Sequence, residues 1–367
     1  MDIFADLEAR LSLLAHSYSL HQGKLYKNPD LIETLKNIPA PLIAPGKHSI
    51  EGGEKPLKRK LAEVFLAQAG RHDEIVLCNG GTHGLSLCFN LFVHPGKNRV
   101  HVISPYWMYL PGVIEQAGGQ MDEIAALHDG ALVPEPQLLA LIESRLGCDS
   151  AALYLAVPAN PLGNYASDDF VMHLIGLCER HDIALIVDHA YFGFGERDTD
   201  TEHLAPLPDL YQHARVSNVF TFSKLMGIPG ARLGFIHSSA THAAHLERLY
   251  RHTNYTLNSF SQTIAHHFLL EKHLISERRR LYFENLHLTR AALNGHCPLP
   301  SGGFFAFLPL PGALTLEDLL NAGIGVVDGR LFGAHYASYV RLCFTSEPPQ
   351  RLKECLALLT SLIAREN

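Results

Sequence analysis

The sequence lacks paired cysteines, long apolar runs and an excess of basic charge. Its 7 cysteines occur without a Cys-x-x-Cys pair, and several lie inside apolar stretches, as is typical of reduced, buried thiols in a cytoplasmic protein. No stretch approaches the roughly 18 consecutive apolar residues that predict a membrane-spanning helix. The 30 Lys and Arg residues against 37 Asp and Glu residues give a net charge of −7, which disfavours a nucleic-acid partner. We therefore expect a cytoplasmic protein with neither a membrane nor a nucleic acid as its partner.

Features of exported and metal-binding proteins are also missing. Residues 1–14 mix acidic and apolar residues at helical spacing and have no cationic start, so we expect no signal peptide. Histidine is abundant, at 23 residues, but the pairs at 242/245 and 266/267 have no carboxylate or thiol at ligand spacing. Because a catalytic zinc site typically needs about three converging protein ligands, we expect no metal and interpret these histidines as surface residues.

The middle of the sequence alternates short β-rich runs with amphipathic stretches. The runs cover residues 75–78, 100–104, 151–157, 183–188 and 219–222, and polar or aromatic residues follow each of them. This alternation predicts an α/β fold with a mostly parallel sheet, helices on both faces, and ligands at the carboxyl ends of the strands. The residues that follow the runs should therefore gather at one edge of the sheet.

The C-terminal part of the sequence has a different pattern. Helical stretches are followed by a Gly-Gly-Phe-Phe turn at 302–305, a strand-like run at 339–344 and a closing helix. We therefore predict a large α/β domain at 46–250, a smaller α+β domain at 251–367, and an N-terminal arm, residues 1–45, that packs with the small domain. The site is expected in the cleft between the two domains.

A glycine-rich segment follows the first β-rich run. Gly80-Gly81-Thr82-His83-Gly84 opens an apolar helical stretch, where backbone N–H groups and the Thr82 hydroxyl can bind a phosphate. The segment lacks the Gly-Lys-Ser/Thr of a nucleoside-triphosphate loop and the G-x-G-x-x-G of a dinucleotide site. A simple tight turn is the alternative interpretation.

Asp188 ends the apolar run that begins at Ile183. An acid at the end of a buried parallel strand faces the ligand crevice, where an unpaired carboxylate is costly, so a cation should meet it. A protonated pyridine nitrogen would satisfy this requirement. A helix cap or an arginine partner is the alternative on this segment alone.

A lysine followed 8 positions later by an arginine is the most specific feature, in the segment Thr221-Phe-Ser223-Lys224-Leu-Met-Gly-Ile-Pro229-Gly-Ala-Arg232-Leu-Gly. A lysine in a desolvated cleft has a depressed pKa and can form an imine. Thr221, Ser223 and Arg232 can donate hydrogen bonds to a phosphate. A surface lysine in a loop is the alternative.

With these motifs the sequence resembles the class I/II aminotransferases, fold-type I enzymes that use pyridoxal 5′-phosphate (PLP), over most of its length. The resemblance implies that Lys224 holds PLP as a Schiff base and, once displaced, acts as a base at the substrate Cα. It also implies that Asp188 keeps the pyridine nitrogen protonated, which an electron sink requires.

The remaining motifs follow in the family's order. Trp107 in Pro105-Tyr-Trp is similar to the aromatic residue that stacks on the pyridine, although it could be an ordinary core tryptophan. Asn160-Pro-Leu-Gly resembles N-P-T-G and Asp-x-x-Tyr191 resembles D-x-x-Y, which implies that Asn160 and Tyr191 contact the phenolic oxygen. Arg341 resembles the arginine that binds the α-carboxylate. The implied cofactor contacts are Gly81, Thr82, Trp107, Asn160, Asp188, Tyr191, Thr221, Ser223, Lys224 and Arg232, and the implied substrate contacts are Arg341, Asn160 and His48.

Three positions depart from the family pattern. His48 stands where the family often has a tyrosine that contacts the partner subunit's phosphate, Leu162 replaces the threonine of N-P-T-G, and His189 replaces an acid. The two imidazoles could transfer protons, but structural hydrogen bonding or drift is the preferred interpretation. PLP binding is still expected.

The resemblance implies an aminotransferase that acts on an α-amino acid and a 2-oxo acid. A lyase or cyclase with the same cofactor, similar to the capreomycidine-synthase-like enzymes, is the alternative, because fold and cofactor do not determine the reaction type. A catalytically inactive regulator is disfavoured, since residues 1–45 are too short and not basic enough for a DNA-binding appendage. The resemblance also implies a homodimer in which residues 254–262 reach the neighbour's cofactor.

Overall fold

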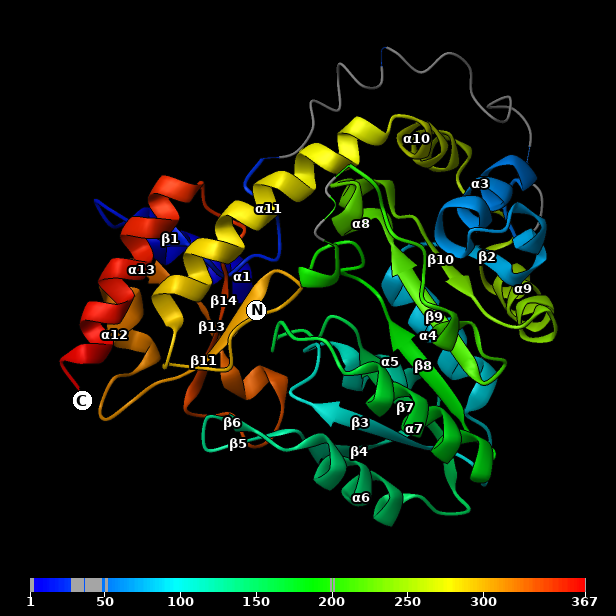
Figure 1. The fold of residues 1–367 in the computed structure, drawn as a ribbon, viewed down its shortest axis with the longest axis horizontal. Coiled ribbons are helices and arrows are strands. Elements are labelled where there is room, and N and C mark those ends of the chain that lie inside the picture. Colours follow the sequence, from blue (N-terminus) through cyan, green and yellow to red (C-terminus); the bar gives the residue numbers. More distant parts are fainter. Residues whose placement is uncertain are drawn as a thin grey trace.

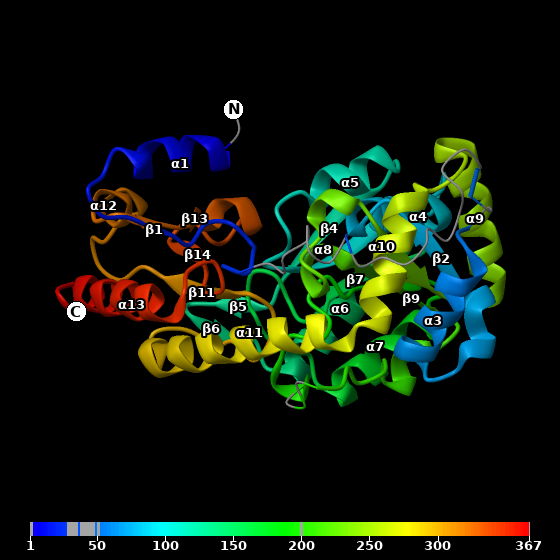
Figure 2. The same cartoon turned by 90° about the horizontal axis from the view of Figure 1, so that it is seen from above.

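The computed structural model describes residues 3–27, 36, 48–49, 52–198, 200 and 202–366. These residues form two lobes, and helix α11 (Lys272–Leu293) extends from the larger lobe along the smaller one (Figure 1). The view from above shows the N-terminal helix α1 (Ile3–Ser12) and the C-terminal helix α13 (Pro349–Ala364) in the same smaller lobe (Figure 2). None of the described helices is long and apolar enough to cross a membrane.

A seven-stranded sheet forms the centre of the large lobe. Its spatial order is β2-β10-β9-β8-β7-β3-β4, and only β10 runs antiparallel to its neighbours. The strands are β2 (Ile75–Cys78), β3 (Arg99–Ser104), β4 (Gln120–Ala125), β7 (Ser150–Ala156), β8 (Ala184–Asp188), β9 (Val216–Thr221) and β10 (Gly234–His237). The predicted α/β class with a mostly parallel sheet is therefore confirmed.

Two strands of this sheet, β4 and β10, were not expected from the sequence. β4 lies at the edge of the sheet and includes Asp122 and Glu123, so it lacks the continuous apolar run of a central strand. In contrast, every residue of β8 is buried, as is typical of a parallel strand covered on both faces.

Helices cover both faces of the sheet. Figure 2 shows α4 (Gly81–Phe92) and α5 (Leu110–Gln116) on one side, and α6 (Glu135–Arg145) and α7 (Asp168–Arg180) on the other. Further along the chain, α9 (Ala240–Asn254) packs against α4, and α10 (Ser259–Leu270) packs against α3 (Lys55–Leu66). The chain thus stays with the large lobe until α11, and the domain boundary at residue 250 remains a prediction.

The small lobe combines residues from both ends of the chain. β1 (Tyr18–Ser19) pairs in parallel with β12 (Ile324–Gly325), and α11 packs against α13. Its three-stranded sheet has the order β11-β14-β13, with β11 (Phe305–Pro309), β13 (Val327–Asp328) and β14 (Tyr339–Cys343). The predicted end of the N-terminal arm at residue 45 falls outside the described residues.

Candidate active site

A cavity of about 320 Å³ lies where the carboxyl ends of the large-lobe strands face the small lobe. The predicted residues that line it are Gly81, Thr82, Trp107, Asn160, Asp188, Tyr191, Thr221, Ser223, Lys224, Arg232 and Arg341. His48 is the predicted contact that does not line it. The His48 ring instead lies edge-on to Tyr255, with the ring centroids 5.3 Å apart.

Lys224 lies in the short helix α8 (Phe222–Leu225), directly after β9. Thr221 caps this helix, because its side-chain oxygen accepts a hydrogen bond from the Ser223 N–H at 3.2 Å. The Lys224 Nζ donates to the carbonyl of Gly23 at 2.6 Å, and no carboxylate in the described part of the chain lies within ion-pair distance of it. Burial lowers the pKa of Lys224 to about 8, so its amine can lose its proton, as an imine-forming lysine must.

Asp188 ends β8 with its carboxylate buried against the cavity. One oxygen accepts from the Tyr154 hydroxyl at 2.9 Å and the other accepts from the Ala190 N–H at 2.9 Å. Burial raises the pKa of Asp188 to about 6, while both hydrogen bonds act in the opposite direction. Within the described ranges no arginine or lysine pairs with it, so the arginine partner that the sequence left open is not found there.

Donors to an anion gather at the start of α4. Gly80 has φ +86° and precedes the helix, and a Cβ on it would lie 3.0 Å from the Arg232 Nη2. A Cβ on Gly81 would lie 3.4 Å from the Thr221 Cβ. The open N–H groups of α4 therefore lie beside a guanidinium and the Thr221 and Ser223 hydroxyls, a donor set that fits a phosphate.

Arg341 lies in the centre of β14 and faces the cavity from the small lobe. Its guanidinium carbon is 4.2 Å from the ring centroid of Phe305 and 4.9 Å from that of Phe332. Its Nη2 donates to the His21 carbonyl at 3.0 Å and its Nη1 donates to the Asn160 Oδ1 at 3.4 Å. Because its buried Nε has no partner among the described residues, the group can still donate to a carboxylate.

Several lining residues were missed by sequence reasoning. Phe4, Gly23, Met108 and Phe305 line the cavity, and the two N-terminal ones are remote in sequence from every motif. A Cβ on Gly23 would lie 2.9 Å from the Phe305 Cζ, so this glycine permits a close approach. For Phe305, the only indication in the sequence was the Gly-Gly-Phe-Phe turn at residues 302–305.

His189 does not line this cavity. It is buried, with Nδ1 3.1 Å from the Val157 carbonyl oxygen and Nε2 3.0 Å from the Asn218 Oδ1. Burial lowers its pKa to about 4. This geometry supports a structural hydrogen-bonding role over proton transfer to a substrate.

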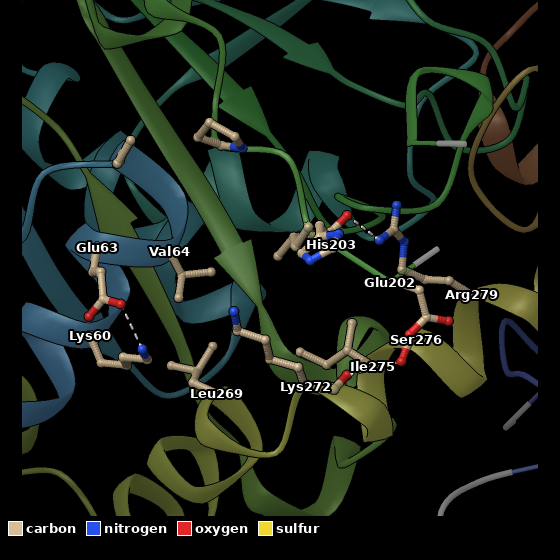
Figure 3. A pocket seen from close by; sticks show the side chains of 13 residues that line it. Lys60, Glu63, Val64, Glu202, His203, Leu269, Lys272, Ile275, Ser276 and Arg279 are labelled. Carbon is tan, nitrogen blue, oxygen red and sulfur yellow. Dashed lines mark hydrogen bonds and ion pairs between the residues drawn. The ribbon is translucent and has the colours of Figure 1, made fainter. Parts of the chain in front are cut away.

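A second cavity, of about 260 Å³, lies between α3, α10 and α11 and contains none of the predicted residues. Figure 3 shows Lys60 paired with Glu63, at 2.8 Å, and Arg279 bonded to the His203 carbonyl, at 2.7 Å. Its charged groups thus interact largely with the protein itself. No group of three or more His, Cys, Asp or Glu side chains in the described ranges could hold a metal ion.

The family model for aminotransferase class I and II matches residues 51–359. Aspartate/prephenate aminotransferase of Thermus thermophilus is 26% identical over 92% of this chain and 89% of that protein. Aromatic-amino-acid aminotransferase 1 of Thermococcus litoralis is 26% identical over 94% and 90%. The solved aspartate aminotransferase of Thermotoga maritima has a TM-score of 0.82 at 20% identity, covering 99% of this chain and 96% of that one.

Because the family model spans most of the chain, the protein belongs to the class I and II aminotransferase family. It is a PLP-dependent aminotransferase of fold type I, which confirms the predicted family, fold, cofactor and activity. The relatives are named as aminotransferases, which favours transamination over the lyase or cyclase alternative.

Proposed function

We propose that Lys224 holds PLP covalently and that the surrounding side chains carry out transamination between an α-amino acid and a 2-oxo acid. The observation that carries this proposal is the presence of two ionisable groups, the half-buried Lys224 and the buried Asp188, on one cavity without an oppositely charged partner among the described residues. PLP fits both groups, because its aldehyde can react with the amine and its ring nitrogen can hold a proton beside the carboxylate. The donors around Arg232 fit its phosphate.

When bound, PLP supplies an electron sink for the bond broken at the substrate Cα. Asp188 would hold a proton at the ring nitrogen, and Asn160 and Tyr191 would donate to the phenolic oxygen. Lys224, once its amine is free and neutral, would take the proton from the substrate Cα and, as the resulting ammonium, would donate it to the carbon that was the cofactor's aldehyde. Arg341 binds the α-carboxylate through two N–H groups, which orients the Cα–H bond toward the lysine.

We also propose that the substrate has an apolar or aromatic side chain. The 3 cations of the described cavity lining are already assigned to the cofactor and the α-carboxylate. Phe305 lies under Arg341, and Phe4 and Met108 pack on the same apolar cluster as Phe332. Comparing kcat/KM for phenylalanine, leucine and aspartate tests this proposal, and a preference for aspartate would contradict it.

We propose that the enzyme is a homodimer with composite sites. Tyr255 and Phe260 are each 58% exposed, and they flank the start of α10. Gln262 donates to Ser49 at 2.9 Å, which holds the His48 segment beside residues 254–262. Both segments could therefore reach a partner's cofactor together. Light scattering after size exclusion is expected to give twice the mass of the chain, and a monomer would contradict the proposal.

We further propose that the enzyme acts in the cytoplasm. All 7 cysteines are free thiols in the structure. Reduced thiols are typical of that compartment. Cell fractionation tests the proposal, and an exclusively exported pool would contradict it.

The first experiment is to titrate the PLP-loaded protein with a panel of amino acids, recording absorption spectra and identifying products by mass. We expect conversion of the cofactor to pyridoxamine phosphate with release of the matching 2-oxo acid. A cyclised or eliminated product, with the cofactor unchanged, would overturn the proposed transamination.

A further inference from the structure

Tyr154 has no part in the proposed function, although it contacts one of its central groups. Its hydroxyl donates to the Asp188 Oδ2 at 2.9 Å, and the residue is 1% exposed. The other oxygen of Asp188 accepts from the Ala190 N–H at 2.9 Å. Each carboxylate oxygen thus has one donor from the protein and keeps further acceptor capacity for a proton held at the cavity.

The sheet register explains how this tyrosine reaches the carboxylate. β7 and β8 pair in parallel, with Tyr154 opposite Ile186 and Ala156 opposite Asp188. Alternate residues of a strand share one face, so Tyr154 and Asp188 are diagonal neighbours on that face. Ala156 carries only a methyl group between them, which leaves room for the phenol to extend along the strand. Phe89 of α4 packs near the phenol ring, with the centroids 6.5 Å apart.

We propose that Tyr154 is a positioning residue that keeps Asp188 ionised and oriented toward the ring nitrogen of the cofactor. This inference rests on the proposed function, since it assigns Tyr154 a role only through the contact between Asp188 and PLP. Tyr154 lies in the middle of an apolar strand. The only signal for it in the sequence is one hydroxyl in the run Ala151-Ala-Leu-Tyr-Leu-Ala156.

The hydrogen bond from Tyr154 opposes the effect of burial on the ionisation of Asp188. Burial already raises the pKa of Asp188 to about 6, and the Tyr154 hydrogen bond is the largest opposing cause. Burial and the charge of Asp188 also raise the pKa of Tyr154 well above its usual value, so the phenol remains a donor at working pH. Without it, the pKa of Asp188 rises further and the carboxyl competes with the ring nitrogen for the shared proton. The nitrogen then carries less positive charge and the electron sink weakens.

The test uses Tyr154→Phe in the loaded enzyme, with PLP labelled with ¹⁵N in the ring. We expect the ¹⁵N signal to move from the protonated position toward that of neutral pyridine. We also expect kcat to fall about 10- to 100-fold, the effect of one hydrogen bond to a charged group, while KM for the amino acid changes by less than about threefold. Tyr282→Phe is the matched control, because Tyr282 is buried and its hydroxyl has no partner in the described part of the chain.

Two further variants separate a local role from a loss of packing. Tyr154→3-fluorotyrosine keeps the hydroxyl and makes it a stronger donor, so the ¹⁵N signal should stay at the protonated position. In the Asp188→Asn background, Tyr154→Phe should have no additional effect on kcat, because the group through which it acts is gone.

Each outcome has a definite meaning. An unchanged ¹⁵N signal and kcat in Tyr154→Phe, with wild-type enzyme that transaminates, overturn this inference and leave the proposed function intact. A wild-type enzyme that binds no PLP covalently overturns the proposed function itself. Additive effects of the Tyr154 and Asp188 substitutions would also contradict the inference.

Discussion

The two walls of the active-site cavity are built in different ways. The cofactor wall, which comprises Gly81, Asp188, Lys224 and Arg232, belongs to the large lobe. Gly81 and Lys224 follow strands of one sheet, Asp188 ends a strand, and Arg232 precedes the antiparallel β10. The carboxylate wall comprises Gly23, Phe305 and Arg341, and it belongs to the small lobe and the N-terminal segment.

Contacts on the cofactor wall form between short strand-to-helix turns that the parallel sheet aligns. On the carboxylate wall the decisive contacts are remote: Arg341 donates to the carbonyl of His21, and Lys224 reaches across to the carbonyl of Gly23. A substitution on the cofactor wall should therefore remove chemistry, whereas one on the carboxylate wall should mainly weaken binding or lobe contact.

The largest effect is expected for Lys224→Ala. Loss of the amine removes both the covalent attachment and the base at Cα, so kcat should fall about 10⁴-fold or more. Borohydride reduction followed by peptide mass analysis should find PLP on Lys224 in the wild type and on no residue in the variant. Covalent PLP on another lysine would refute the assignment. Lys97→Ala, at a surface pair with Asp182, is the control.

Arg341→Lys should have a smaller and different effect. The lysine keeps the charge but loses the planar pair of donors and the contact with the Phe305 and Phe332 rings, so KM for the amino acid should rise about 10- to 100-fold. PLP occupancy should remain that of the wild type. The matched control is Arg330→Lys, at an exposed position. A loss of PLP binding with normal KM would contradict the division between the two walls.

The pH dependence of PLP attachment should show the desolvation of the cofactor wall. Because the pKa of Lys224 is about 8, the neutral fraction of its amine grows as pH rises through that value. Covalent incorporation into apoprotein should therefore increase about tenfold from pH 7 to pH 9 and then level off, whereas with an ordinary lysine, whose pKa is about 10.4, it would still be rising steeply at pH 9. Borohydride trapping at each pH measures this increase. A flat profile across that range would contradict a titrating Lys224.

The smallest effect on chemistry is expected for Gly23→Ala. The added methyl group would lie 2.9 Å from the Phe305 Cζ and force that ring to shift, at a cost of about 1–3 kcal/mol. We expect a lower Tm and a KM raised a few-fold, with kcat close to wild type. Gly112→Ala, in α5 with no atom within 4 Å of the added carbon, should not lower Tm, because alanine favours the helix, and should leave KM unchanged. Equal effects of the two substitutions on Tm and KM would contradict a role of Gly23 in positioning the carboxylate wall.

Much of the cofactor wall was predictable from the sequence because its residues lie in short motifs after apolar runs. Asp188 ends a buried strand, and Lys224 lies in the short helix that follows another. A parallel sheet places such residues at one edge, independently of the remaining fold. The edge strand β4 escaped prediction because its charged residues do not form a continuous apolar run. The antiparallel β10 begins with glycine and ends with histidine, so only two of its four residues form an apolar run.

The amino-acid sequence by itself therefore determined the α/β class, the family and many of the residues that line the cavity, but not Phe4, Gly23 or Met108. The tertiary structure alone decided which neighbours those residues have: Tyr154 contacts Asp188, Gly23 contacts Lys224 and the Phe305 ring contacts Arg341. Periodicity and local motifs report only interactions between residues close in sequence. These contacts join segments 34, 201 and 36 residues apart, so they form only when the sheet register and the packing of the lobes bring those segments together.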